Sequence, residues 1–147
     1  MIDNKLMSLV QPFQNKAKVF LQVVRKRYNN LWVFETRRDL ARQKWLYQNG
    51  KSWTLKSKHL TGQAVDRIFF DKYNNPTWRG DYKYLQYVWV MCGMTTIPKE
   101  QCHLQDDGRS IENVMKTNSE RRKKTTSASD RKLLSEVNDA FRRYWYK

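Results

Sequence analysis

Apolar residues recur at helical spacing near both ends of the chain. Between Phe13 and Val24 they fall every three or four positions, after Pro12, which can begin a helix, and before the cationic run 25–27, which suits a helix C-terminus. A second apolar stripe occupies positions 133–145, behind Asp130 as a candidate cap. Both stretches are therefore predicted to be helices.

Runs rich in β-branched and aromatic residues predict short strands between the helices. Two such runs are Leu31–Thr36 and Ala64–Phe70. Two further helices are predicted, one over residues 38–49 and one that Asp81 caps and Gly93 ends. Helices that come first and between short strands predict an α+β fold.

The tail differs from the rest of the chain in charge. Residues 116–147 contain ten Lys and Arg against four Asp and Glu, and Arg121–Ser129 is typical of a flexible basic linker. We therefore predict a main domain over residues 1–115, followed over 116–147 by a basic linker and an amphipathic helix packed on the same domain. The alternative is that this cationic helix binds an anionic membrane surface.

One decapeptide places a histidine and a carboxylate around a turn. Residues 57–66 follow the pattern S-x-H-x-x-G-x-A-x-D, with His59 before the turn at Gly62 and Asp66 inside a predicted strand. Strand alternation puts Asp66 in line with three apolar residues, and a buried carboxylate is costly unless it is paired or holds a cation. His59 and Asp66 are thus candidates for two of the three protein ligands of a catalytic zinc site.

The search for a third ligand is short because the chain contains two histidines. The second is His103, and Glu100 precedes it by three residues, a spacing that lets a carboxylate lie beside a metal without binding it. Such a glutamate can take a proton from a zinc-bound water. Asp106 and Asp107 are alternative bases, and Cys102 is an alternative ligand.

With these motifs the chain resembles the zinc peptidases that cut peptidoglycan stem peptides. That family includes D-alanyl-D-alanine carboxypeptidases and dipeptidases, and the L-alanyl-D-glutamate endopeptidases that bacteriophages use as endolysins. The resemblance implies that His59, Asp66 and His103 bind Zn²⁺ and that Glu100 is the base. It also implies a hedgehog/DD-peptidase-like fold, in which a small antiparallel sheet carries the zinc site and helices pack against the sheet.

An upstream segment, Glu35–Gln43, is similar to the E-x-x-R-x-x-x-R-Q segment that precedes the zinc motif in this family. The resemblance implies that Arg38 reaches the site, where a guanidinium could stabilise the oxyanion; the alternative is a solvated basic helix face. Ser57 is expected to be a donor that orients a ligand. The chain departs from the family at Leu104 and at residues 94–98, which leaves the identity of the cleaved bond open.

Composition limits the kinds of partner that the chain is expected to bind. The 147 residues carry a net charge of +15, which attracts polyanions such as wall polymers. No recognisable nucleic-acid module occurs, so we expect no specific nucleic-acid partner.

The sequence shows neither a secretory signal nor an apolar span, which predicts a protein kept in the host cytoplasm until it is released to the wall. The two cysteines are predicted to be free thiols.

The combined prediction is a monomeric, zinc-dependent peptidoglycan peptidase. The most specific form of it is a phage-type endolysin that cleaves the L-Ala–D-Glu bond of the stem peptide with a metal-activated water. A D-Ala-D-Ala carboxypeptidase or dipeptidase is the alternative within the same chemistry. An inactive protein that binds anionic polymer or nucleic acid is the alternative from another class.

Overall fold

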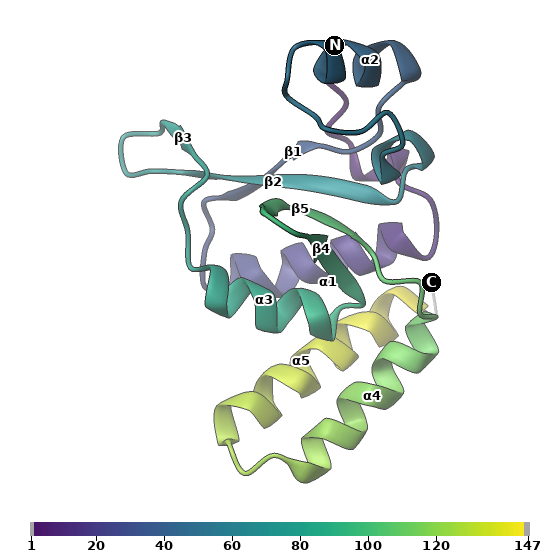
Figure 1. The fold of residues 1–147 in the computed structure, drawn as a ribbon. Helices are drawn as coiled ribbons and strands as arrows, with labels where there is room; N and C mark the ends of the chain where they lie inside the picture. Colours follow the sequence, from purple (N-terminus) through teal and green to yellow (C-terminus); the bar gives the residue numbers. More distant parts are fainter. Residues whose placement is uncertain (1, 146–147) are drawn as a thin grey trace.

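An antiparallel sheet lies at the centre of the fold, and its strands follow the order β1-β2-β5-β4, with β3 paired to the far end of β2 (Figure 1). The computed structural model describes residues 2–145, apart from the side chains of Gln101 and Trp145. The elements are η1 Leu6–Ser8, α1 Phe13–Arg25, β1 Leu31–Glu35, α2 Leu40–Gln48, η2 Lys58–Thr61, β2 Ala64–Phe70, β3 Pro76–Thr77, α3 Tyr82–Met91, β4 Met94–Ile97, β5 Glu100–Asp106, α4 Ile111–Lys124 and α5 Ala128–Trp145.

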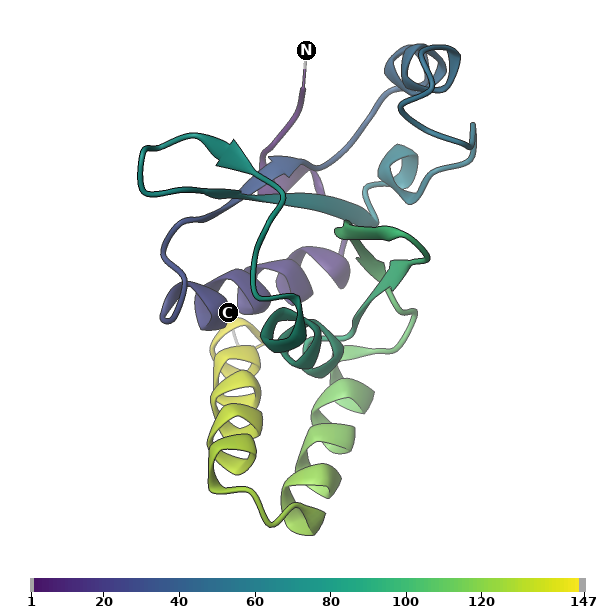
Figure 2. The same ribbon diagram turned by 60° about the vertical axis from the view of Figure 1, so that its left-hand side comes forward.

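The predicted α+β class and small antiparallel sheet are confirmed. Helices α1 and α3 lie on one side of the sheet, α4 and α5 form a hairpin beyond them, and α2 lies at the opposite end of the molecule (Figures 1 and 2). Strand β2 is central, and six of its seven residues are buried. Its Val65 and Phe69 side chains join those of α1 and α3 in one core, which fixes the sheet on its helices.

The C-terminal helix belongs to this core. Leu134, Val137, Ala140 and Phe141 in α5 are buried in the main apolar cluster. The apolar stripe therefore packs against the rest of the molecule and is not available to enter a membrane surface. The side chain of Trp145, which the predicted stripe includes, lies outside the described residues. No helix within residues 2–145 is both long enough and apolar enough to cross a bilayer.

The predicted flexible linker over Arg121–Ser129 is wrong except at residues 125–127, because α4 extends to Lys124 and α5 begins at Ala128. Arg121–Lys124 is the last turn of α4, a helix that begins where the Ser110 hydroxyl accepts a hydrogen bond from the Asn113 N–H at 3.1 Å. Four basic residues in a last turn interact favourably with the negative end of the helix dipole, so the charge run stabilises a helix end. The boundary predicted after residue 115 consequently falls within α4.

The burial of α5 leads to a test of its structural role. Phe141→Ala should lower the free energy of unfolding by about 3–5 kcal/mol, because it removes a buried ring and leaves a cavity. Arg143→Ala, an exposed change on the same helix, should alter it by less than about 0.5 kcal/mol. Urea unfolding followed by circular dichroism measures both, and equal stability of the two variants would contradict the packing of α5 in the core.

Candidate metal centre

Strand pairing and one turn bring the candidate ligands together. Asp66 in β2 is the direct partner of His103 in β5, so these two side chains leave neighbouring strands at the same level. His59 lies in η2, and Gly62 ends η2 with φ of 72°, a left-handed conformation that glycine adopts without a Cβ penalty. The turn at Gly62 leads directly into β2, which explains the spacing of seven between His59 and Asp66.

The three side chains converge on one carboxylate oxygen. Asp66 Oδ1 is 3.2 Å from His59 Nε2 and 3.5 Å from His103 Nδ1. One ligand atom from each residue lies within 4.8 Å of the others, and all three residues are buried. Two imidazole nitrogens and a carboxylate oxygen at this separation form a group that could hold a metal ion.

Hydrogen bonds on the outer sides of both rings favour a metal between them. His59 Nδ1 lies 2.5 Å from the carbonyl oxygen of Thr36, and His103 Nε2 lies 3.0 Å from Gln105 Oε1. Both partners are oxygen atoms, which can accept a hydrogen bond from the outer nitrogen of each ring. The inner nitrogens face Asp66 Oδ1 and hydrogen-bond to it when they carry a proton. A cation bound at this place would replace those protons, and outer hydrogen bonds of this kind orient metal-binding histidines.

Burial and mutual pairing together determine the pKa values of Asp66 and His103. Burial by itself would raise the pKa of the Asp66 carboxyl, but hydrogen bonds and charge from His103 and His59 hold that pKa well below its usual value. Burial alone would lower the pKa of His103, but its contact with Asp66 raises that pKa overall. Asp66 is therefore ionised throughout the neutral range, as a metal ligand must be.

Arg38 reaches the site, as the family resemblance implies. Its Nη2 donates to Asp66 Oδ2 at 3.1 Å, its Nε donates to Glu35 Oε1 at 2.9 Å, and its Nη1 donates to Gln43 Oε1 at 3.1 Å. The alternative of a solvated basic face does not hold for Arg38, because its side chain is largely buried. Arg38 thus occupies the second oxygen of Asp66 and leaves the first oxygen to the histidines.

Glu35 is a structural residue of the site whose role the sequence did not predict. It is 1% exposed, pairs with Asp66 in the strand register and binds the guanidinium groups of both Arg38 and Arg42. Gln43, also buried, donates from Nε2 to the carbonyl oxygen of Thr54 at 2.7 Å. The E-x-x-R-x-x-x-R-Q pattern was the available signal, because all its fixed residues belong to this network.

Ser57 contacts the backbone of His59. Its Oγ accepts a hydrogen bond from the backbone N–H of His59 at 3.2 Å and caps the start of η2. This contact fixes the residue that carries the imidazole. A hydroxyl that accepts one hydrogen bond can still donate its own proton, so the donor role of Ser57 stays a prediction.

Glu100 lies at the start of β5 and lines the same cleft as Asp66 and His103. The cleft has a volume of about 600 Å³. The indole N–H of Trp53 donates to Glu100 Oε1 at 2.9 Å, so one carboxylate oxygen is held within the cleft.

The alternative residues from the sequence are differently placed. Asp106 and Asp107 bind the buried ammonium group of Lys16, with Nζ–Oδ1 distances of 2.6 and 3.1 Å, and neither lines the cleft. Cys102 lines the cleft, but burial raises the pKa of its thiol to about 11, whereas metal ligation needs a thiolate. Both cysteines are free, as predicted.

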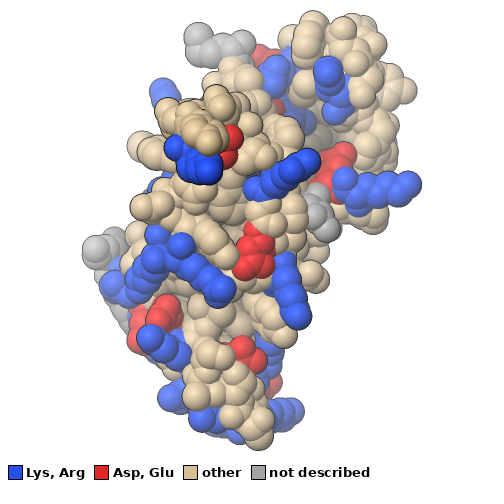
Figure 3. Space-filling model, turned by 90° about the vertical axis from the view of Figure 1, so that its left-hand side faces the viewer, with Lys and Arg blue, Asp and Glu red and all other residues tan. Residues whose placement is uncertain are grey.

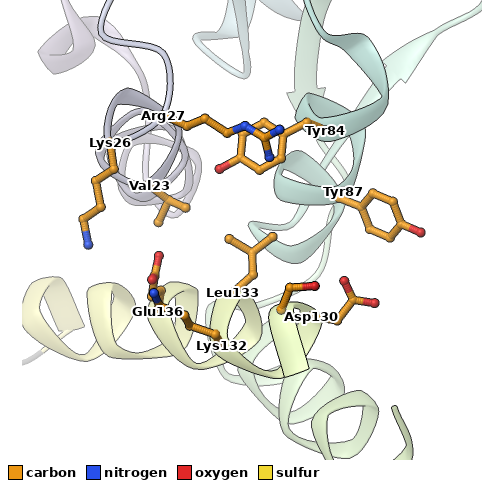
Figure 4. Close-up of a pocket in the computed structure, with 10 residues that line it drawn as sticks. Val23, Lys26, Arg27, Tyr84, Tyr87, Asp130, Lys132, Leu133 and Glu136 are labelled. Carbon is orange, nitrogen blue, oxygen red and sulfur yellow. The ribbon is translucent and has the colours of Figure 1, made fainter. Parts of the chain in front are cut away.

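A separate groove of about 440 Å³ lies between α1, α3 and α5 (Figure 4). Lys26, Arg27 and Lys132 line it together with two acidic residues, Asp130 and Glu136. Lys and Arg are also spread over the face shown in Figure 3, with a few acidic groups between them. The groove carries side chains of both signs and none of the three candidate metal ligands.

The fold of this chain occurs in a solved bacterial enzyme. No family model matches the chain, and no curated protein sequence matches it. Among solved structures, the L-Ala D-Glu endopeptidase ChiX of Serratia marcescens is similar with a TM-score of 0.53 and 25% sequence identity, over 68% of this chain and 81% of that chain. This match and the buried group of His59, Asp66 and His103 confirm the predicted resemblance, and the chain has a metallopeptidase fold.

Metal titration tests the group of three residues. Zn²⁺ is used as the probe. Replacing His59, Asp66 or His103 by alanine should lower the affinity for Zn²⁺ by about 100-fold or more, because loss of only a hydrogen bond to a metal ligand already lowers metal affinity by about 10–100-fold. Affinity should rise with pH through the raised pKa of His103, because a protonated ring cannot bind metal. Calorimetry measures both effects. Cys102→Ser should bind as the wild type does, and loss of binding there would move a ligand role to the thiol.

Proposed function

We propose that this chain is a zinc-dependent peptidase that cleaves the L-Ala–D-Glu bond of peptidoglycan stem peptides. The observation that carries the proposal is the buried group of His59, Asp66 and His103 beside an open cleft, in a fold similar to that of an L-Ala D-Glu endopeptidase. Two imidazoles and one carboxylate are a ligand set typical of catalytic zinc, and the outer hydrogen bonds of both rings fit it.

Glu100 is proposed as the general base and acid. When bound, Zn²⁺ supplies a Lewis acid and an acidified water at neutral pH. Because the indole of Trp53 holds Oε1, the other oxygen of Glu100 remains to take the proton from the attacking water. The same oxygen then returns that proton to the amine that leaves when the peptide bond breaks.

Arg38 is proposed to stabilise the oxyanion that forms on the scissile carbonyl. A guanidinium has five N–H groups, and three of those of Arg38 have the protein acceptors described above. One N–H on each of Nη1 and Nη2 is left for the substrate. The ion pair with Glu35 fixes the guanidinium plane, and a donor fixed before reaction needs no reorganisation as negative charge develops.

We also propose that the positive charge of the chain holds it against anionic wall polymers. A net charge of +15 and the exposed arginines of α5, Arg131, Arg142 and Arg143, support this partner, since the apolar side of the helix is in the core. The phage-type role in host lysis that the sequence resemblance implies stays a prediction.

Digestion of purified peptidoglycan identifies the bond. Mass spectrometry should find products with a new N-terminal D-glutamate, and treatment with a chelator should abolish them. Released D-alanine would instead indicate the carboxypeptidase alternative. Turnover that is indifferent to the chelator would contradict the zinc assignment, and a complete lack of turnover would favour the inactive polymer-binding alternative.

The base assignment is tested by Glu100→Gln, which keeps the hydrogen bond from Trp53 but removes the proton acceptor. Turnover should fall by about 10²–10⁴-fold while zinc stays bound, because general base catalysis contributes about that factor. Steady-state kinetics and metal analysis of the same sample measure the two quantities. Asp107→Asn is the matched control and should keep most of the activity; the reverse result would transfer the role to Asp107.

A further inference from the structure

Three tryptophans line the cleft beside the candidate metal centre and remain well exposed. Trp45 in α2 is 53% exposed, Trp53 after α2 is 68% exposed, and Trp78 after β3 is 48% exposed. They come from three separate segments and meet at one concave site. Exposed apolar surface gathered around a cleft marks a place where a ligand binds, whereas single exposed aromatic residues need no explanation.

Contacts on the inner sides of two of these rings fix them in place. The indole of Trp53 is hydrogen-bonded to Glu100, and the buried Gln43 holds the loop through the next residue, Thr54. Trp78 packs edge-on against Phe34, with ring centroids 5.3 Å apart and planes at 90°. The aromatic faces are therefore positioned before a ligand arrives, which lowers the entropy lost on binding.

The groups between the tryptophans are polar. Lys51, Ser52, Thr54 and Ser57 line the same cleft with an ammonium group and three hydroxyls. A lipid chain would place apolar surface against the Lys51 ammonium group, at a cost in free energy. A ligand with flat C–H faces and a rim of hydroxyl and amide groups would satisfy both the indoles and the polar side chains. A pyranose amino sugar has this construction.

We propose that Trp45, Trp53 and Trp78 form a subsite for the muramyl sugar that carries the stem peptide. This inference rests on the proposed cleavage of the L-Ala–D-Glu bond. In peptidoglycan the L-alanine is joined to the sugar through one lactyl group, so the sugar ring lies about two residue lengths, or about 7 Å, from the scissile carbonyl. A cleft of about 600 Å³ has room for a sugar as well as the peptide.

The proposal makes the enzyme selective for stem peptides that are still attached to glycan. N-acetylmuramyl-L-Ala-D-Glu-L-Lys should be cleaved with a kcat/KM at least about tenfold higher than that of the free tripeptide L-Ala-D-Glu-L-Lys, since tenfold corresponds to about 1.4 kcal/mol and three aromatic contacts together supply at least about that much. Trp45→Ala and Trp78→Ala should each reduce this ratio toward one. Trp32→Ala is the matched control, because Trp32 is also 53% exposed but does not line the cleft, and it should leave the ratio unchanged.

A binding measurement separates the subsite from catalysis. Metal-free protein is titrated with N-acetylmuramyl-L-alanine while tryptophan fluorescence is followed; saturable binding is expected for the wild type and Trp32→Ala, and weaker binding for Trp45→Ala and Trp78→Ala. Equal cleavage of both substrates by the wild type, with no binding of the muramyl compound, would overturn the subsite and leave the peptidase function intact. Cleavage of neither substrate would overturn the peptidase function, and the titration alone would then decide on the subsite.

Discussion

The buried carboxylate of Asp66 is the constraint on which the site depends. A carboxylate in the interior is tolerated when both of its oxygens have cationic or donor partners, and here one oxygen faces two imidazoles while the other accepts from Arg38. The strand register makes this possible, since Glu35, Asp66 and His103 are neighbours across β1, β2 and β5. Sheet pairing places Asp66 beside His103, and the turn at Gly62 brings His59 to the same point.

A single network joins the metal-binding group to the remainder of the cleft. Arg38 connects Asp66 to Glu35 and to Gln43, and Gln43 in turn holds the loop that carries Trp53. Trp53 then binds Glu100, so the proposed ligand and the proposed base are linked through residues of α2 and the loop after it. A substitution in α2 or in the loop after it can therefore disturb catalysis without altering a metal ligand.

The sequence predicted those parts of the site that depend on local spacing. His59 and Asp66 are separated by one glycine turn, and His103 was found because the chain has one other histidine. The burial of Glu35 and the gathering of the tryptophans depend on contacts between distant segments, which periodicity does not encode. The end of α4 was mistaken for a linker because a charge run has the same composition in a solvated coil and in the last turn of a helix.

The state of the two cysteines has a consequence for where the molecule can remain intact. Cys92 is buried, Cys102 is partly buried, and burial raises the pKa of both thiols, so at neutral pH each is overwhelmingly the thiol, which reacts slowly with a disulfide or an oxidant. The covalent connections of the fold are then the same under reducing and oxidising conditions. A transfer between compartments of opposite redox potential would require neither refolding nor the help of a thiol exchange partner.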